Sequence, residues 1–270
     1  SKSKSLKTRI VYLQEMDVLR IIQITINEKN MNNFWFIGLP YAAILIFIIG
    51  SFLRYKVTPF QVSSLSTQFL EGKKLFWGNR PFHWGIIFLF FGHLIAFLFP
   101  RTLIVWNGIP ARLLIIEASA FAFAIAAFTG LMLLIFRRLT NRKLQMVTTK
   151  MDVAVYVVLL VQIITGIWIA LFHRWGSTWF ASSLTPYVKS IFVLKPDMNI
   201  IATMPLMVKV HVSSAFVLLG MIPFTRFMHF LVYPFAYIWR PYQLVIWNWE
   251  RKKIRTSNKL ATNQKISEEV

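Results

Sequence analysis

Five long apolar runs constrain the fold of this chain more than any other feature of its sequence. Each approaches the roughly 20 residues that an α-helix needs to cross the hydrocarbon core of a bilayer. Only helices and closed barrels satisfy their backbone polar groups in lipid, so runs of this length predict spanning helices. We therefore expect an all-α, polytopic membrane protein with five transmembrane helices, at Phe34–Leu53, Phe82–Pro100, Leu113–Phe136, Met151–Phe172 and Val208–Trp239.

The composition agrees with this class. The 270 residues are 56% hydrophobic and only 15% charged, which excludes an ordinary soluble domain. The net charge of +20 comes from Lys and Arg between and beyond the apolar runs, where they contact anionic lipid, and we expect no nucleic-acid partner. Cysteine is absent, so any metal or cofactor within this chain must be held by His, Met or carboxylates.

The distribution of Lys and Arg predicts the orientation. These residues are more numerous near 54–82, in 137–150 and after residue 240 than in the alternate connections. The positive-inside rule therefore places the N-terminus outside and the C-terminus in the cytoplasm. We expect an amphipathic or partner-bound extension at 1–33, the membrane domain at 34–245 and a basic polar tail at 246–270.

Four of the five histidines fall in the second and fifth predicted spans. Ionisable residues inside a membrane are costly and usually functional. Because successive spans alternate in direction, His93 faces His211 toward the outer side and His83 faces His229 toward the inner side. Two imidazoles from different helices are what a six-coordinate b haem requires, since the porphyrin leaves two axial positions. We predict two b haems with these axial ligands, and we interpret His173 as an interfacial residue.

The spacing of the histidines leaves a mismatch in height. On straight helices, His211 and His229 lie about 27 Å apart, whereas His83 and His93 lie about 15 Å apart. Helix tilt, a kink at Pro223 or inclined haem planes are ways to absorb the difference. Spacing alone leaves open the alternative that each histidine is hydrogen-bonded inside the bundle without a haem.

Small residues near the histidines also have two interpretations. They would let a flat macrocycle approach a helix, or they would serve close helix packing. The residues concerned are Gly85, Gly92, Ser213, Ser214 and Gly220.

Arg226 lies three residues before His229 within an apolar run, where a guanidinium needs a partner. That partner is a haem propionate or a carboxylate of another subunit, unless the side chain snorkels to the inner surface. We also assign Arg54 to a haem propionate.

Several stretches together carry a family resemblance: GSFLRY (50–55), FHWGIIFLFFGH (82–93), TTKMDVAVYVVLLVQIITG (148–166), KVHVSSAFVLLGMIPFTRFMHFLVYP (209–234) and YQLV (242–245). In these stretches, and over about residues 34–245, the chain resembles the cytochrome b (gamma) subunit of membrane-bound respiratory nitrate reductase. The resemblance implies five helices and two b haems in the energy-conserving membrane of a bacterium or archaeon. It implies that menaquinol or ubiquinol is oxidised near the outer haem, and that electrons reach an iron–sulfur subunit and a molybdenum catalytic subunit. Residue by residue, it implies the same pairs, His93 with His211 and His83 with His229.

One departure from the family concerns the quinone region. The family has a lysine early in the third span, whereas this chain reads NGIPARLLIIEASA (107–120), with Arg112 as the nearest basic residue and Glu117 beyond it. Arginine stays charged, so it does not replace lysine at a proton-coupled site. We predict that Arg112 lies in a quinone region that is rebuilt, weak or absent.

Two alternative functions remain open. In the first, the same haems serve nitrite oxidation or another redox complex, with a different direction of electron flow or without a quinone site. In the second, the histidines bind a metal ion or relay protons in a transporter, which requires carboxylates within the membrane. Glu117 and Asp152 are the carboxylates in or next to the spans.

Overall fold

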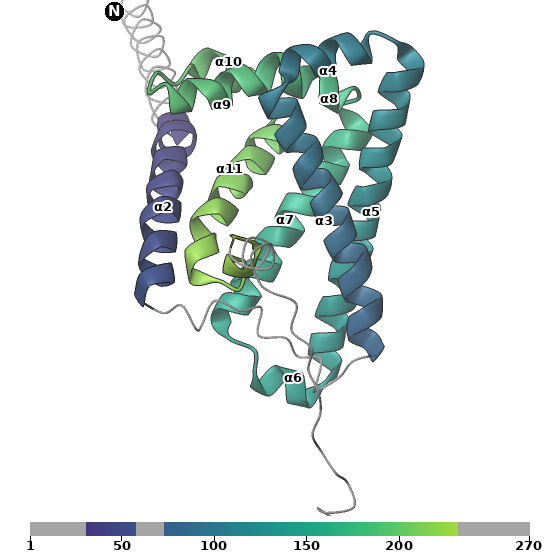
Figure 1. Cartoon of the computed structure of the whole chain (residues 1–270), viewed down its shortest axis with the longest axis vertical. Coiled ribbons are helices and arrows are strands. Elements are labelled where there is room, and N and C mark those ends of the chain that lie inside the picture. The colour runs from purple at the N-terminus through teal and green to yellow at the C-terminus, as the bar shows by residue number, and fades with distance from the viewer. Residues whose placement is uncertain (1–30, 58–72, 232–270) are drawn as a thin grey trace, which may run out of the picture. The chain divides into compact units, whose positions relative to one another are not determined.

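The computed structural model describes residues 31–57 and 73–231 (Figure 1). Most of the predicted N-terminal extension and the whole of the predicted C-terminal tail lie outside the described residues. Within the described ranges, all regular secondary structure is helical.

Five stretches are long and apolar enough to cross a membrane: Met31–Val57, Leu75–Leu98, Pro110–Thr140, Lys150–Phe172 and Leu206–Phe224. They contain the helices α2 (Leu39–Val57, preceded by the π-turn η1 at Phe34–Gly38), α3 (Lys73–Leu98), α5 (Pro110–Thr140), α7 (Lys150–Phe172) and α11 (Leu206–Met221). The prediction of an all-α, multi-pass membrane protein is confirmed. The helix α3 begins at Lys73, well before Phe82, where the second span was predicted to begin. Arg80 and Pro81 precede the apolar run, but they lie inside the helix.

The fifth span differs from its prediction as one helix over Val208–Trp239. Instead, α11 ends at Met221, the 3₁₀ turn η4 (Ile222–Phe224) follows, and Thr225 is extended with φ −119° and ψ 176°. A proline inside a helix removes one hydrogen bond and its ring clashes with an earlier carbonyl, which explains a break at Pro223. Helix resumes at Met228. We call residues 222–227 the break.

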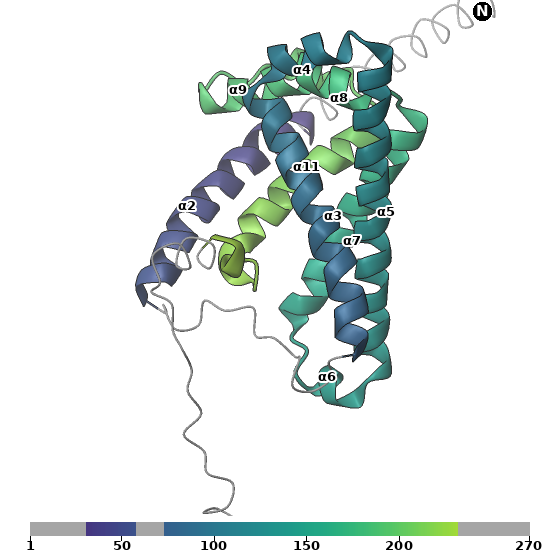
Figure 2. The same cartoon turned by 45° about the vertical axis from the view of Figure 1, so that its right-hand side comes forward.

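The bundle is built from two close helix associations. The helix α3 packs along α5, whereas α11 lies against both α2 and α7 (Figures 1 and 2). Contact between α5 and α7 joins the two groups, and α3 and α11 are not among the helix pairs that pack closely. The two helices that carry the histidines are therefore held by different partners.

Glycines allow the backbones of α3 and α5 to approach. A Cβ atom on Gly85 would lie 2.6 Å from the carbonyl oxygen of Phe123, and one on Gly130 would lie 2.7 Å from that of Gly78. The Gly130 position also faces the backbone nitrogen of Phe82. Small residues are the usual means of close helix approach in membranes, where no hydrophobic force drives helices together.

Short helices close one end of the bundle, which we call the capped end. The connection after α3 forms α4 (Pro100–Asn107), and the connection after α7 forms α8 (Gly176–Trp179), η3 (Phe180–Leu184), α9 (Thr185–Phe192) and α10 (Met198–Ala202) (Figure 1). The helix α6 (Arg142–Met146) lies at the opposite end. At the capped end, the Tyr187 hydroxyl donates to the carbonyl oxygen of Phe36 at 2.7 Å. Burial raises the pKa of Tyr187, so this hydroxyl stays protonated and ties the cap to the first span.

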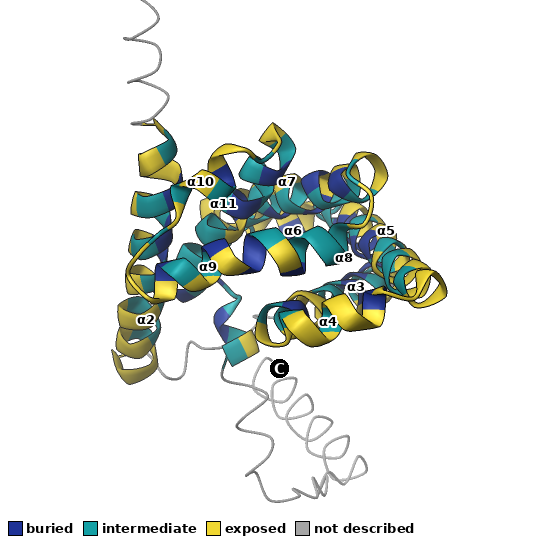
Figure 3. Cartoon of the chain, turned by 90° about the horizontal axis from the view of Figure 1, so that it is seen from above, coloured by how far each residue is buried: buried dark blue, intermediate teal, exposed yellow. Residues whose placement is uncertain are grey.

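Exposed positions cover much of α2, α4 and α5, and buried positions concentrate where the helices meet (Figure 3). Many of the exposed side chains on the spans are large and apolar, as lipid contact requires. Two buried clusters hold the bundle. One joins the cap to the upper parts of α7 and α11 around Tyr187, Ile191 and Val208, and the other joins α3, α5 and α7 around Leu131, Leu159 and Ile163.

The close approach of α3 and α5 gives a stability prediction. Replacing Gly130 by alanine places a methyl group against the backbone of α3, which cannot move aside as a side chain can. Overpacking of this kind costs about 1–3 kcal/mol, and occasionally more. We expect Gly130→Ala to lower the thermal unfolding midpoint in detergent, measured by circular dichroism.

The matched control for this prediction is Gly38→Ala, because a Cβ there meets its nearest neighbour, Phe34 Cδ2, at an ordinary 3.8 Å. An equal effect of both variants on the midpoint would contradict the packing account.

Candidate functional site

Four histidines lie in two pairs. The ring centroids of His93 on α3 and His211 on α11 are 6.4 Å apart. The ring centroids of His83 on α3 and His229, which follows the break, are also 6.4 Å apart. The first pair lies toward the capped end and the second toward the opposite end. His173 is the C-cap residue of α7 and belongs to neither pair.

The separation within each pair has the size needed for one iron between two rings. With metal–nitrogen bonds of about 2 Å and roughly 1 Å from each nitrogen to its ring centre, two axial imidazoles have centres roughly 6 Å apart. Among the described residues, no three His, Cys, Asp or Glu side chains gather into a metal-binding group. Each pair therefore offers two nitrogens, which suits an iron whose four other ligands come from a porphyrin.

In three of the four histidines, a hydrogen bond at Nδ1 leaves Nε2 as the nitrogen available to a metal. His83 and His93 donate from Nδ1 to the carbonyl oxygen four residues earlier in α3, at 2.9 and 2.7 Å. His229 donates from Nδ1 to the carbonyl oxygen of Arg226 at 2.5 Å. A carbonyl oxygen only accepts, so Nδ1 carries a proton, and in the neutral imidazole Nε2 then keeps its lone pair. This arrangement is the usual one for metal-bound histidine.

His211 is held from a neighbouring helix instead. Its Nδ1 lies 3.0 Å from Oγ1 of Thr165 on α7, and its Nε2 lies 3.1 Å from Nε2 of Gln162 on the same helix. The Thr165 hydroxyl also donates to the carbonyl oxygen of Val161 at 2.6 Å, so toward His211 it accepts. The Ser214 hydroxyl donates to Oε1 of Gln162, which fixes the orientation of that amide.

Thr165 and Gln162 are not among the site residues that the sequence analysis predicts. A signal for them exists in LLVQIITGIW (159–168), where Gln162, Thr165 and Gly166 share one helix face within an apolar run. Polar residues inside a span usually face the bundle and serve a function. A Cβ on Gly166 would lie 3.1 Å from Cε1 of His211, so this face of α7 closely borders the ring.

The break is held by α2. Nη1 of Arg54 donates to the carbonyl oxygen of Pro223 at 2.6 Å. A Cβ on Gly50, one turn earlier on α2, would lie 2.9 Å from Cβ of Pro223. Gly50 thus gives the proline room, and Arg54 satisfies a carbonyl where the regular helix ends.

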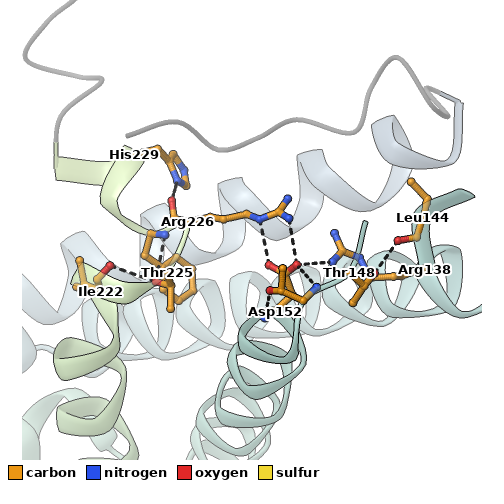
Figure 4. A network of polar contacts seen from close by, with 10 residues as sticks. Arg138, Leu144, Thr148, Asp152, Ile222, Thr225, Arg226 and His229 are labelled. Atoms are coloured by element: carbon orange, nitrogen blue, oxygen red, sulfur yellow. Dashed lines mark hydrogen bonds and ion pairs between the residues drawn. The ribbon is translucent and has the colours of Figure 1, made fainter. Parts of the chain in front are cut away.

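The break also contacts α7 through an ion-pair network (Figure 4). Nε and Nη2 of Arg226 each lie 3.0 Å from a carboxylate oxygen of Asp152, and Nη1 of Arg138 lies 3.2 Å from Oδ2. Asp152 also accepts from the backbone N–H of Thr149 at 3.0 Å in a capping box that begins α7. The network therefore joins the ends of α5 and α7 to the residue whose carbonyl orients His229.

These contacts revise the interpretation of Arg226. The sequence predicts a haem propionate, a carboxylate of another subunit or the membrane surface as its partner, whereas the structure provides Asp152 of the same chain. Asp152 lies near the start of the fourth candidate span and Arg226 just after the fifth, so a carboxylate 74 positions earlier in the chain reaches the guanidinium. The propionate roles of Arg54 and Arg226 stay predictions.

The break also removes the mismatch in height between the histidines. The ideal spacing of about 27 Å between His211 and His229 assumes one helix throughout. Because α11 ends at Met221 and the chain turns before Met228, His229 returns to the level of His83. The interruption at Pro223 is therefore one of the predicted explanations that the structure shows.

Some of the glycines near the histidines border a neighbouring helix, as the packing interpretation predicts. Gly85 faces α5, and a Cβ on Gly220 would lie 3.6 Å from Cα of Ala43 on α2. The packing interpretation is supported for Gly85, because the backbone of α5 fills the space beside it, whereas Ala43 lies at an ordinary contact distance from a Cβ on Gly220. A Cβ on Gly92 would meet nothing within 4 Å.

The predicted quinone region lies at the capped end. Arg112 is exposed in the first turn of α5, with its guanidinium carbon 4.7 Å from the Trp106 ring centroid. Glu117 accepts from the backbone N–H and the hydroxyl of Ser177, at 2.8 and 2.6 Å. The rings of Phe180 in η3 and His93 meet nearly at right angles, with centroids 5.3 Å apart. A role of Arg112 toward quinone stays a prediction.

Comparison with known proteins identifies the family of the chain. The family model described as nitrate reductase gamma subunit matches residues 32–248. The nitrate reductase gamma chain of Bacillus subtilis is 30% identical over 76% of this chain and 93% of its own length. The respiratory nitrate reductase 2 gamma chain of Escherichia coli is 26% identical over 80% and 96%, respectively. The nitrate reductase-like protein NarX of Mycobacterium tuberculosis is 29% identical over 77% of this chain but 33% of its own length. This multi-pass membrane protein therefore belongs to the nitrate reductase gamma subunit family.

Proposed function

We propose that this chain is the membrane-anchoring dihaem cytochrome b subunit of a nitrate-reductase-like complex. It takes electrons from menaquinol or ubiquinol near the capped end and delivers them, at the opposite end, to an iron–sulfur subunit that serves a molybdenum catalytic subunit. The distribution of Lys and Arg supports an orientation with the capped end outside and the opposite end in the cytoplasm.

One observation carries this proposal: two histidine pairs, each with ring centroids 6.4 Å apart, lie toward opposite ends of one bundle. His93 and His211 would hold the outer haem, and His83 and His229 would hold the inner one. The haem supplies one-electron chemistry when it is bound, whereas the protein fixes ligand geometry and environment. In three of the four rings, a main-chain carbonyl accepts from Nδ1, which would leave Nε2 to bind the iron.

The contacts of the two carboxylates weaken the transporter alternative. Asp152 is paired with Arg138 and Arg226, and Glu117 accepts hydrogen bonds from Ser177. Among the described residues, neither carboxylate is hydrogen-bonded or ion-paired to a histidine, and the histidines lie in pairs rather than in a larger donor group. The arrangement thus favours two haem sites over one ion path.

The first alternative, in which the same haems serve another redox complex, is supported by the exposed arginine where the family has a lysine. The deciding experiment uses membranes that contain the whole complex. We expect a quinol analogue such as menadiol to reduce both b haems, and nitrate then to reoxidise them, as followed by absorbance. Reduction of the haems by dithionite but by no quinol would contradict the quinol proposal and favour the alternative.

A further inference from the structure

We propose that Thr165 is a positioning residue for the outer haem, which it influences through His211. This inference rests on the proposed function and adds to it the contact that sets the tautomer and ring orientation of one axial ligand. The Thr165 hydroxyl accepts a hydrogen bond from Nδ1 of His211 at 3.0 Å, which would leave Nε2 as the nitrogen that binds the haem iron.

The first reason is the direction of the Thr165 hydrogen bonds. A hydroxyl has one hydrogen, and that of Thr165 faces main-chain carbonyl oxygens of its own helix, that of Val161 at 2.6 Å and that of Gln162 at 3.2 Å. Its remaining lone pairs can only accept, so Nδ1 of His211 must be the donor. Thr165 is buried, with 7% exposure, and water does not compete for this contact. The hydroxyl is therefore a fixed acceptor on the rigid helix α7.

The second reason is that Gln162 gives the same tautomer independently. Its amide nitrogen lies 3.1 Å from Nε2 of His211, and its amide oxygen is occupied by the Ser214 hydroxyl. The amide therefore donates to Nε2, which must carry a lone pair. An iron at Nε2 would displace this amide, whereas the Thr165 contact lies on the other side of the ring and is retained. Thr165, rather than Gln162, would thus remain hydrogen-bonded to His211 when the haem is bound.

The third reason is a contrast with the other three histidines. Their Nδ1 atoms donate to main-chain carbonyls three or four residues earlier in the chain, which no side-chain substitution removes. His211 alone in the two pairs has a side-chain acceptor at Nδ1, and it comes from α7, which carries neither pair. Partners of the second ring nitrogen raise ligand basicity and fix ring orientation. A substitution at position 165 should therefore change the redox properties of the outer haem.

The test is a redox titration of Thr165→Val in the whole complex, with Thr165→Ser as the conservative variant. Loss of the hydroxyl reduces electron donation by His211 and so favours reduced iron. We expect the midpoint potential of the outer haem to rise by up to about 59 mV. For a one-electron couple, this shift corresponds to a tenfold change in the ratio of oxidised to reduced haem. The electron paramagnetic resonance g values of that haem should also shift, because the ring is free to rotate. The inner haem should keep its potential.

Thr129→Val is the matched control, because the Thr129 hydroxyl makes the same bond to the carbonyl four residues earlier, at 2.8 Å, but is exposed on α5. It should leave both potentials unchanged. Selective loss of the outer haem in Thr165→Val, restored in Thr165→Ser, would also support the inference.

Two results would overturn it: an outer haem unchanged in Thr165→Val, or the same shift in Thr165→Val and Thr165→Ser. If Thr165→Val loses both haems, Thr165→Ala is compared with Thr165→Ser by the same criteria. A wild-type complex without two b haems would instead refute the proposed function, so the two failures are distinguishable.

Discussion

The variant His211→Ala should lose the outer haem and keep the inner one. Its partner His93 faces it at 6.4 Å across the bundle, and one imidazole does not hold a six-coordinate b haem. His93→Ala should have the same effect. By the same reasoning, His83→Ala or His229→Ala should lose the inner haem and keep the outer one. Pyridine haemochrome measurement should give one haem per chain in each variant where the wild type has two.

His173→Ala is the control, because His173 ends α7 and lies in neither pair. It should keep both haems. A redox titration then identifies which haem remains in each ligand variant, since the partners within a pair must give the same result. Retention of both haems in all four variants would refute the ligand assignment, and loss of different haems by His93→Ala and His211→Ala would refute the pairing.

Asp152→Asn should release the break and selectively weaken the inner haem. The substitution keeps an oxygen for the backbone N–H of Thr149 but removes the charge that Arg138 and Arg226 share. Removing one partner of a buried ion pair costs about 3–5 kcal/mol. The cost is smaller here, because the Arg226 side chain is 27% exposed. We expect less inner haem per chain and an unchanged outer haem, measured by haemochrome count and redox titration.

Asp197→Asn is the matched control for charge loss. Asp197 begins α10 at the capped end and accepts from the backbone N–H of Asn199 at 3.0 Å, a role that asparagine also fills. An inner haem that remains fully bound in Asp152→Asn, or an equal loss of both haems, would show that the network does not specifically position His229.

The apolar runs predicted where the five spans lie, although not the break in the fifth, and the alternating direction of the spans predicted which histidines face one another. Apolar length indicates where a helix crosses, and alternating direction brings His93 to the level of His211. The propionate roles, the haems and the orientation of the chain are predictions that rest on the sequence and the resemblance. The interruption at Pro223 was also visible as a candidate kink, although its consequence for His229 was not.

Contacts between distant residues could not be predicted in the same way. Asp152 and Arg226 are 74 positions apart, and Thr165 and His211 are 46 apart. Hydropathy marks each as a polar residue in or beside a span but does not say which residues meet, because that depends on the rotation of each helix about its axis. Gly85 shows the same limit, since a glycine beside a histidine faces α5 instead of the paired ring.

The most direct test of the central claim is a haem count on the purified wild-type chain in detergent. The claim predicts a dithionite-reduced minus oxidised spectrum of b type and two haems per chain by pyridine haemochrome. It also predicts a low-spin electron paramagnetic resonance signal from two axial imidazoles at each iron. A folded, membrane-inserted preparation without haem would contradict the claim, and the histidine pairs would then need another explanation.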